Sequence, residues 1–96
     1  MDLLLTYDVD TTSVEGARRL RRVAKICEGY GIRVQKSVFE VVCTEAQLVQ
    51  LRHRLTQTID LTADNIRIYR LPIHTLDAVQ HLGIGVQPLH RGDQII

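Results

Sequence analysis

The chain has 96 residues, of which 45% are hydrophobic and 24% are charged, a composition typical of one globular domain. Its 12 basic and 11 acidic residues leave a net charge of +1, so the total charge does not indicate a polyanion-binding protein. No stretch is long and apolar enough to cross a bilayer, and the first residues lack the basic segment of a targeting signal. We therefore expect a cytoplasmic protein without a membrane partner.

The first predicted element is a short strand. An apolar and aromatic run over residues 3–7 has the length of a buried strand and stops at polar residues 8–12, which places Asp8 at the strand's C-terminal end. Hard oxygen ligands suit Mg²⁺ or Mn²⁺, and a strand holds a carboxylate rigidly. One carboxylate alone is a poor metal site, but two copies of Asp8 would meet if the chain dimerised there. The alternative is that Asp8 and Asp10 only cap the next helix or solvate a turn.

A helix is predicted over about residues 13–28. The segment Thr12–Glu15 matches a capping box, and Gly29 and Gly31 supply conformations that end a helix. One apolar stripe follows helical spacing and consists of Ala17, Leu20, Val23, Ala24 and Cys27.

The opposite side of this helix is basic. At 100° per residue, the side chains away from the apolar stripe are Arg18, Arg21, Arg22 and Lys25, with Arg19 beside them. Solvated helix faces usually mix both signs, whereas the segment Arg18–Lys25 contains no acidic residue. The pattern favours phosphate binding over an ordinary solvated face.

Residues 32–43 are rich in β-branched side chains, and their alternation breaks at residues 35–37, which indicates either a tight hairpin or a bulged strand. Arg33, Lys36 and Ser37 would extend the phosphate-binding surface, while Phe39 either packs in the core, which we favour, or stacks on a base. A second capping box at residues 44–47 predicts a helix over about residues 45–57, with Leu48, Leu51 and Leu55 on one face.

The last predicted strand covers residues 66–71, which alternate with period two and end at Pro72. The element order is that of an α+β, ferredoxin-like βαββαβ sandwich. We expect residues 1–72 to form a nucleic-acid-binding core and residues 73–96 to form a tail that adds one or two edge strands to a dimer partner.

Cysteines and histidines indicate no site. Cys27 and Cys43 lie in apolar segments without CxxC spacing, which predicts buried, reduced thiols rather than zinc ligands. The four histidines lack a serine or cysteine partner arrangement, and no glycine-rich phosphate loop is present. These absences argue against histidine-assisted nucleophilic catalysis and against a nucleotide hydrolase.

Several segments together resemble the Cas-two family, the small CRISPR-associated protein of spacer acquisition. They are Tyr7–Val9, the basic helix Arg18–Lys25, Glu28–Gly31, Arg33–Glu40 and the strand Ile66–Leu71. The resemblance implies a ferredoxin-like homodimer whose C-terminal strands add to the partner's sheet, with Asp8 of both protomers at a Mg²⁺ site. It also implies a complex in which this dimer bridges two dimers of the Cas-one integrase along duplex DNA.

The resemblance assigns roles to individual residues. Asp8 would be the catalytic metal ligand and Tyr7 its neighbour, with Ser37 and Phe39 nearby on the second strand. Together with the basic helix, it predicts a nucleic-acid-binding set of Tyr7, Arg18, Arg19, Arg22, Lys25, Arg33, Ser37 and Phe39.

Three functions follow as hypotheses. The chain is expected to act as a dimeric DNA-binding scaffold for the integrase in spacer acquisition. A Mg²⁺- or Mn²⁺-dependent phosphodiesterase activity, on single-stranded RNA or duplex DNA, would be a second property outside that role. The alternative is a non-CRISPR, ferredoxin-like RNA-binding or small-molecule regulatory domain without catalysis, which is disfavoured because the strands lack the paired aromatics of base-stacking sheets.

Overall fold

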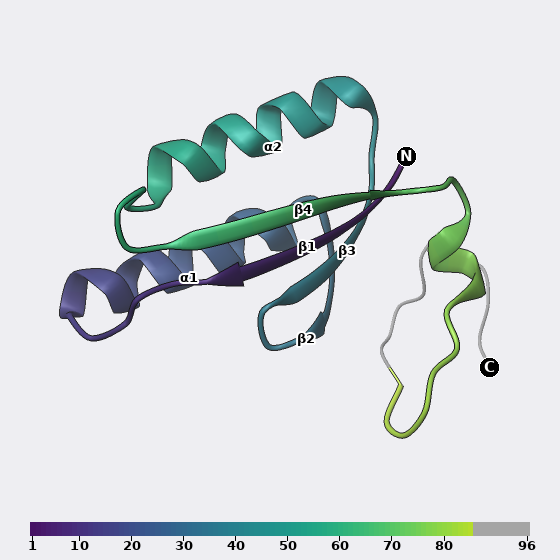
Figure 1. Cartoon of the computed structure of the whole chain (residues 1–96), viewed down its shortest axis with the longest axis horizontal. Helices are drawn as coiled ribbons and strands as arrows, with labels where there is room; N and C mark the ends of the chain where they lie inside the picture. The colour runs from purple at the N-terminus through teal and green to yellow at the C-terminus, as the bar shows by residue number, and fades with distance from the viewer. Residues whose placement is uncertain (86–96) are drawn as a thin grey trace.

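The computed structural model describes residues 1–85 of the chain. The elements, in order, are β1 (Asp2–Asp8), α1 (Val14–Glu28), β2 (Gly31–Gln35), β3 (Val38–Val42), α2 (Glu45–Thr58), β4 (Asn65–Leu71) and the short 3₁₀ helix η1 (Thr75–Ala78). Figure 1 shows this βαββαβ plan, with residues 72–85 extending from one end of the sheet after β4. The predicted ferredoxin-like order is confirmed.

The four strands form one antiparallel sheet in the order β2-β3-β1-β4. β1 is central, with Leu5 opposite both Phe39 of β3 and Ile68 of β4. Because side chains alternate across a strand, Leu3, Leu5 and Tyr7 point to one face of the sheet. The opposite face, which we call the open face, carries the other side chains of β1: Asp2, Leu4, Thr6 and Asp8. Their partners on β4 include Tyr69, opposite Leu4, and Arg67, opposite Thr6.

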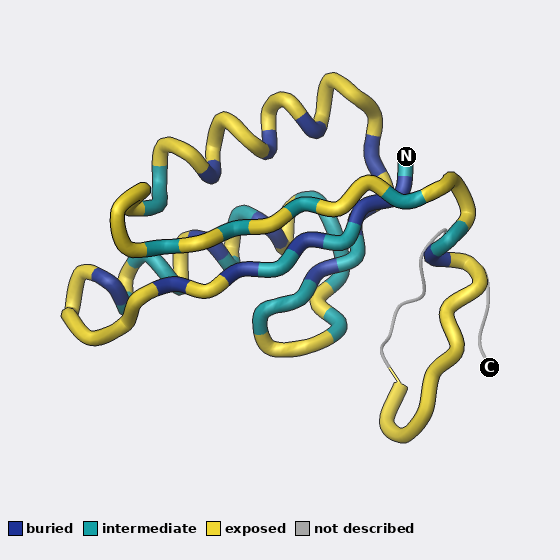
Figure 2. The backbone as a smooth tube through the Cα atoms, in the orientation of Figure 1, coloured by how far each residue is buried: buried dark blue, intermediate teal, exposed yellow. Residues whose placement is uncertain are grey.

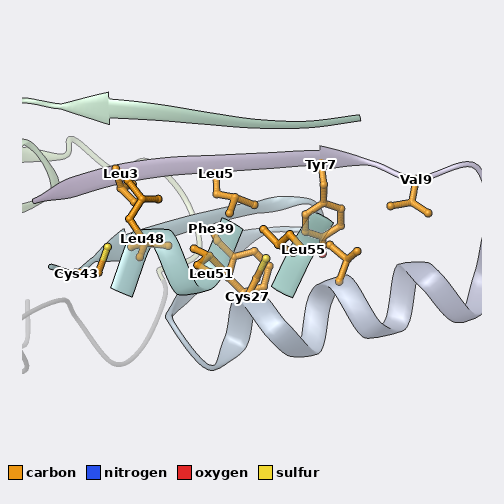
Figure 3. Close-up of a cluster of buried hydrophobic side chains, with 12 residues drawn as sticks. Leu3, Leu5, Tyr7, Val9, Cys27, Phe39, Cys43, Leu48, Leu51 and Leu55 are labelled. Atoms are coloured by element: carbon orange, nitrogen blue, oxygen red, sulfur yellow. The ribbon is translucent and has the colours of Figure 1, made fainter. Parts of the chain in front are cut away.

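Both helices cover the same face of the sheet and close the hydrophobic core there. Leu3, Leu5 and Tyr7 of β1 project toward the helices (Figure 3). Phe39, at the centre of the sheet, is fully buried. The helices complete the core with Val23 and Cys27 from α1 and Leu48, Leu51 and Leu55 from α2.

The two helix starts differ. The capping box of α2 is confirmed, since Thr44 accepts from the Gln47 amide and the Gln47 side chain accepts from the Thr44 amide. The box predicted at Thr12 is wrong by one residue: Ser13 is the N-cap and accepts from the Gly16 amide at 3.0 Å. Thr12 is not free to cap the helix, because its amide and hydroxyl both donate to the Asp10 carboxylate.

The β2–β3 connection combines both alternatives drawn from the sequence. The strands form a hairpin through Lys36 and Ser37, and their register shifts between Arg33 and Gln35. Gly31 begins β2 without positive φ, and its value lies in its size, because a Cβ there would collide with the Glu40 carbonyl oxygen.

The tail begins with η1, which packs on one end of the open face. Leu76 is buried, and its amide donates to the fully buried Asp2 carboxylate at 3.0 Å. Residues 79–85 form no strand within the single chain. The expected edge strand was to pair with a partner's sheet, so it stays a prediction. The rest of the predicted tail, residues 86–96, lies outside the described residues.

Both thiols are free and buried, as predicted. Burial raises the pKa of the Cys27 thiol to about 12 and also raises the pKa of Cys43. A protonated, enclosed thiol is a weak nucleophile and a weak metal ligand. These cysteines therefore serve as core side chains.

Replacing Phe39 with alanine should destabilise the fold strongly, because the ring is fully enclosed between sheet and helices. We expect a loss of about 3–5 kcal/mol in the free energy of unfolding, measured by urea denaturation followed by circular dichroism. Val42→Ala, on the same strand but 36% exposed, is the matched control and should cost much less. A loss for Phe39→Ala no greater than the control's would show that the core is not organised around this ring.

Candidate nucleic-acid interface and metal site

Asp8 is an exposed carboxylate between two buried residues. It ends β1 opposite Asn65 of β4, while Tyr7 and Val9 on either side are only 6% and 7% exposed. Within residues 1–85 the Asp8 carboxylate has no hydrogen bond or ion pair. An anchored backbone with a free hard-oxygen donor fits a Mg²⁺ or Mn²⁺ ligand.

One chain supplies only part of such a site. Among the described residues, no group of three or more His, Cys, Asp or Glu side chains is placed to hold a metal ion. Asp8 would therefore need further oxygen donors from water, from nucleic-acid phosphate or from a second chain. The carboxylate oxygens of Asp8 suit Mg²⁺, but one chain supplies too few oxygen donors to hold the ion.

Asp10 has a different role from Asp8. Its carboxylate accepts from the Thr12 amide at 3.0 Å and from the Thr12 hydroxyl at 2.8 Å. These two bonds, the amide bond first, hold the pKa of Asp10 below its ordinary value. The turn alternative is thus confirmed for Asp10, which shapes the loop between β1 and α1.

Asp64 is a structural residue that the sequence analysis missed. Its side chain is fully buried and accepts from the Arg19 Nε at 2.8 Å, the Asp10 amide at 3.0 Å and the Asp60 amide at 2.9 Å. Burial alone raises the pKa of Asp64, but the bonds from Arg19 and the two amides outweigh it and lower the pKa. We call Asp64, Arg19 and the two loop amides the Asp64 clasp.

A repeated signal in the sequence accompanies this clasp. Asp60 accepts from the amide and hydroxyl of Thr62, as Asp10 does from Thr12, so two Asp-x-Thr turns flank one buried carboxylate. Arg19 is correspondingly withdrawn from solvent, with its side chain 18% exposed. It belongs to the clasp and is not part of the exposed basic surface expected from the helix pattern.

Tyr7 and Phe39 are too buried to contact nucleic acid, which corrects that expectation. The Tyr7 hydroxyl donates to the Lys36 carbonyl and accepts from Arg33 Nη2, both at 3.3 Å. The Arg33 guanidinium also lies 5.3 Å from the centre of the Phe39 ring. Apolar packing in the core holds the Tyr7 and Phe39 rings in place. Arg33 remains half-exposed on the edge strand β2. Ser37, half-buried in the hairpin turn, contributes its carbonyl to the Tyr7 amide at 3.1 Å.

The exposed basic surface is narrower than the sequence predicted. We call it the α1 ridge, and it consists of Arg18, Arg21, Arg22 and Lys25, all exposed. Within residues 1–85 the ridge makes one ion pair, between Arg18 and Glu15 at 3.6 Å, and both side chains are more than half exposed to water. Figure 2 shows how exposed and buried positions alternate along α1. A cationic helix face of this kind attracts phosphates at long range.

Comparisons with known proteins give the family. The family model described as CRISPR associated protein Cas2 matches residues 1–79, which include β1, both helices and β4. The chain belongs to the Cas2 family. This membership rejects the non-CRISPR alternative considered from the sequence.

Relatives of this Cas2-family chain match over most of its length. The CRISPR-associated endoribonuclease Cas2 1 of Moorella thermoacetica is 49% identical over 86 residues, 90% of each chain. The CRISPR-associated endonuclease Cas2 of Halalkalibacterium halodurans is 49% identical over 83 residues, 86% of each. The crystal structure of Streptococcus pyogenes Cas2 at pH 6.5 has a TM-score of 0.77 and 51% identity, covering 86% of this chain and 100% of that one.

The described part of this Cas2-family chain contains no helix that is long and apolar enough to span a membrane.

Proposed function

We propose that this chain is a dimeric DNA-binding scaffold of CRISPR spacer acquisition. The observation that carries the proposal is the α1 ridge, an exposed helix face with no acidic side chain between Arg18 and Lys25. Such a face binds the phosphate backbone without reading base sequence. Sequence-independent binding suits a protein that must hold DNA segments of any sequence.

The open face of the sheet supports the dimer in this proposal. Leu4 is half-buried and Tyr69, its partner on β4, is 40% exposed, so a second copy of the chain would remove apolar surface there from water. Asp8 lies at the end of the same face. A two-fold axis near it would bring two Asp8 carboxylates together.

The paired Asp8 carboxylates would hold a Mg²⁺ or Mn²⁺ ion. Bound there, the ion would polarise a phosphodiester and lower the pKa of a coordinated water. The chain's own contribution is to hold Asp8 between buried Tyr7 and Val9 and to leave its oxygens free. Relatives named endonuclease and endoribonuclease support a phosphodiesterase activity, on RNA or duplex DNA, beside the scaffold role.

The partner in this proposal is the Cas-one integrase. A dimer with one α1 ridge on each protomer offers two equivalent basic surfaces, and two integrase dimers bridged along one duplex require that symmetry. Residues 73–96 would contribute to the dimer and to the integrase contacts.

Light scattering coupled to size-exclusion chromatography tests the assembly. The 10.9 kDa chain should elute at micromolar concentration with about twice its monomer mass, because the open face and the lone Asp8 each need a partner. Adding the integrase and a duplex should give one larger complex that contains this dimer. A monomer at micromolar concentration would remove the basis for the shared metal site and for the bridging role.

A further inference from the structure

The Asp64 clasp joins three separate parts of the chain. Asp64 precedes β4, Arg19 belongs to α1, and the Asp10 amide belongs to the loop that follows Asp8. Both Asp64 oxygens are occupied: Oδ1 by the Asp10 amide, and Oδ2 by Arg19 Nε and the Asp60 amide. With no exposed surface and a guanidinium beside it, this carboxylate is not available as a metal ligand.

The clasp acts on the backbone at Asp8 and in the loop that follows it. Asp8 pairs with Asn65, the residue directly after Asp64, so one strand contact ties Asp8 to the clasp. Two residues after Asp8, the Asp10 amide donates to Asp64, so a second contact ties the outgoing loop. Val9 between them is buried. The Asp8 side chain thus projects from a backbone that is paired at Asp8 with the neighbour of Asp64 and bonded two residues later to Asp64 itself.

We propose that Asp64 and Arg19 are positioning residues for the Asp8 carboxylate. Asp64 fixes the loop after Asp8 and precedes Asn65, the strand partner of Asp8. Arg19 neutralises Asp64 and fixes its orientation through Nε and, at 3.4 Å, Nη2. The proposal rests on the proposed function only where it names Asp8 a metal ligand. The ordering of residues 8–10 by the clasp is a property of the chain alone.

The first measurement is independent of metal. In Asp64→Asn, the amide nitrogen of asparagine would meet a donor that now faces a carboxylate oxygen, so one clasp bond must break. The ¹⁵N relaxation order parameters of Val9 and Asp10 should fall in this variant and in Arg19→Gln. Arg19→Lys keeps the charge and should restore part of that order. Arg18→Gln, one residue away on the α1 ridge, is the matched control and should leave the order parameters of Val9 and Asp10 unchanged.

The second measurement follows Mn²⁺ binding to the purified dimer by calorimetry. Asp64→Asn and Arg19→Gln should each raise the Kd for Mn²⁺ by about tenfold, as the loss of a group that orients a metal ligand does. Duplex binding through the α1 ridge should stay within about twofold of wild type, since the ridge side chains are untouched. Val23→Ala, a core substitution that lowers stability without touching the clasp, should leave the Mn²⁺ Kd unchanged.

The two measurements separate the possible failures. Unchanged order at Val9 and Asp10 in both Asp64→Asn and Arg19→Gln would overturn the positioning role. So would a Val23→Ala variant that weakens Mn²⁺ as much as they do. If wild type and Asp8→Asn bind Mn²⁺ equally, the metal part of the proposed function fails, while the order parameters still decide the role of the clasp. If Asp64→Asn does not fold, the comparison of Arg19→Gln with Arg19→Lys decides it.

Discussion

Metal-dependent cleavage of RNA or duplex DNA should fall by orders of magnitude in Asp8→Asn. The substitution keeps the shape of the side chain but removes the charge that holds a hard cation. Duplex binding should persist, because the α1 ridge is on another element. The fold should be as stable as wild type, since without metal the two Asp8 carboxylates of the proposed dimer would repel and the amide would relieve that repulsion. Cleavage, binding and thermal unfolding of one preparation measure all three expectations.

Asp10→Asn is the matched control for this experiment. Asp10 is also exposed and lies two residues away, but its carboxylate accepts from Thr12 in a turn. The Asp10→Asn variant should therefore retain cleavage. Spacer acquisition in cells then separates the two roles of the chain: it should survive Asp8→Asn if the scaffold is the function. Loss of acquisition in a variant that still dimerises and binds the integrase would make the nuclease the function instead.

Reversing two charges of the α1 ridge should weaken duplex binding steeply and flatten its dependence on salt. Each phosphate contact adds about 0.9 to the slope of log K against log salt concentration. In a dimer, Arg18→Glu with Arg22→Glu removes up to four such contacts, so the slope should fall by about 3 to 4. Binding isotherms at several salt concentrations, with two unrelated duplex sequences, measure the slope and its independence of sequence.

The control for the ridge carries the same change in charge on the other helix. Arg52 and Arg54 of α2 are also exposed, and Arg52→Glu with Arg54→Glu alters the net charge equally. If binding depends on the ridge itself, only the α1 variant flattens the slope. Equal slopes in the two variants would mean that overall charge, and not the ridge, attracts the duplex.

The fold was predictable because its elements carry local signals. These signals are the capping box at Thr44, the helical spacing of Leu48, Leu51 and Leu55, and the alternation before Pro72. Each depends on residues only a few positions apart. The start of α1 was placed one residue early because two adjacent hydroxyl residues compete for the cap. Asp10 decides that competition by binding Thr12, and a capping pattern does not include the residue before the box.

The candidate site was less predictable, because burial there depends on distant parts of the chain. A helical projection places Arg19 beside the ridge, but its partner Asp64 is 45 residues away. Phe39 and Tyr7 were assigned to nucleic acid from the resemblance, whereas their burial depends on how both helices close on the sheet. Asp8 was located correctly at the strand end, since that position follows from β1 alone.

The modification rates of the two buried thiols can be used to measure opening motions of the fold. With a pKa of about 12, the Cys27 thiol is almost entirely protonated at neutral pH and shielded from reagents. The rate at which a reagent modifies Cys27 therefore measures how often α1 separates from the sheet. The rate for Cys43 measures how often the end of β3 opens. Rates that still differ after correction for each thiol's rate in the unfolded chain would show that one of these regions opens before the rest unfolds. Because both native thiols are shielded, a cysteine introduced on the surface would be labelled first, which suits distance measurements across an assembly.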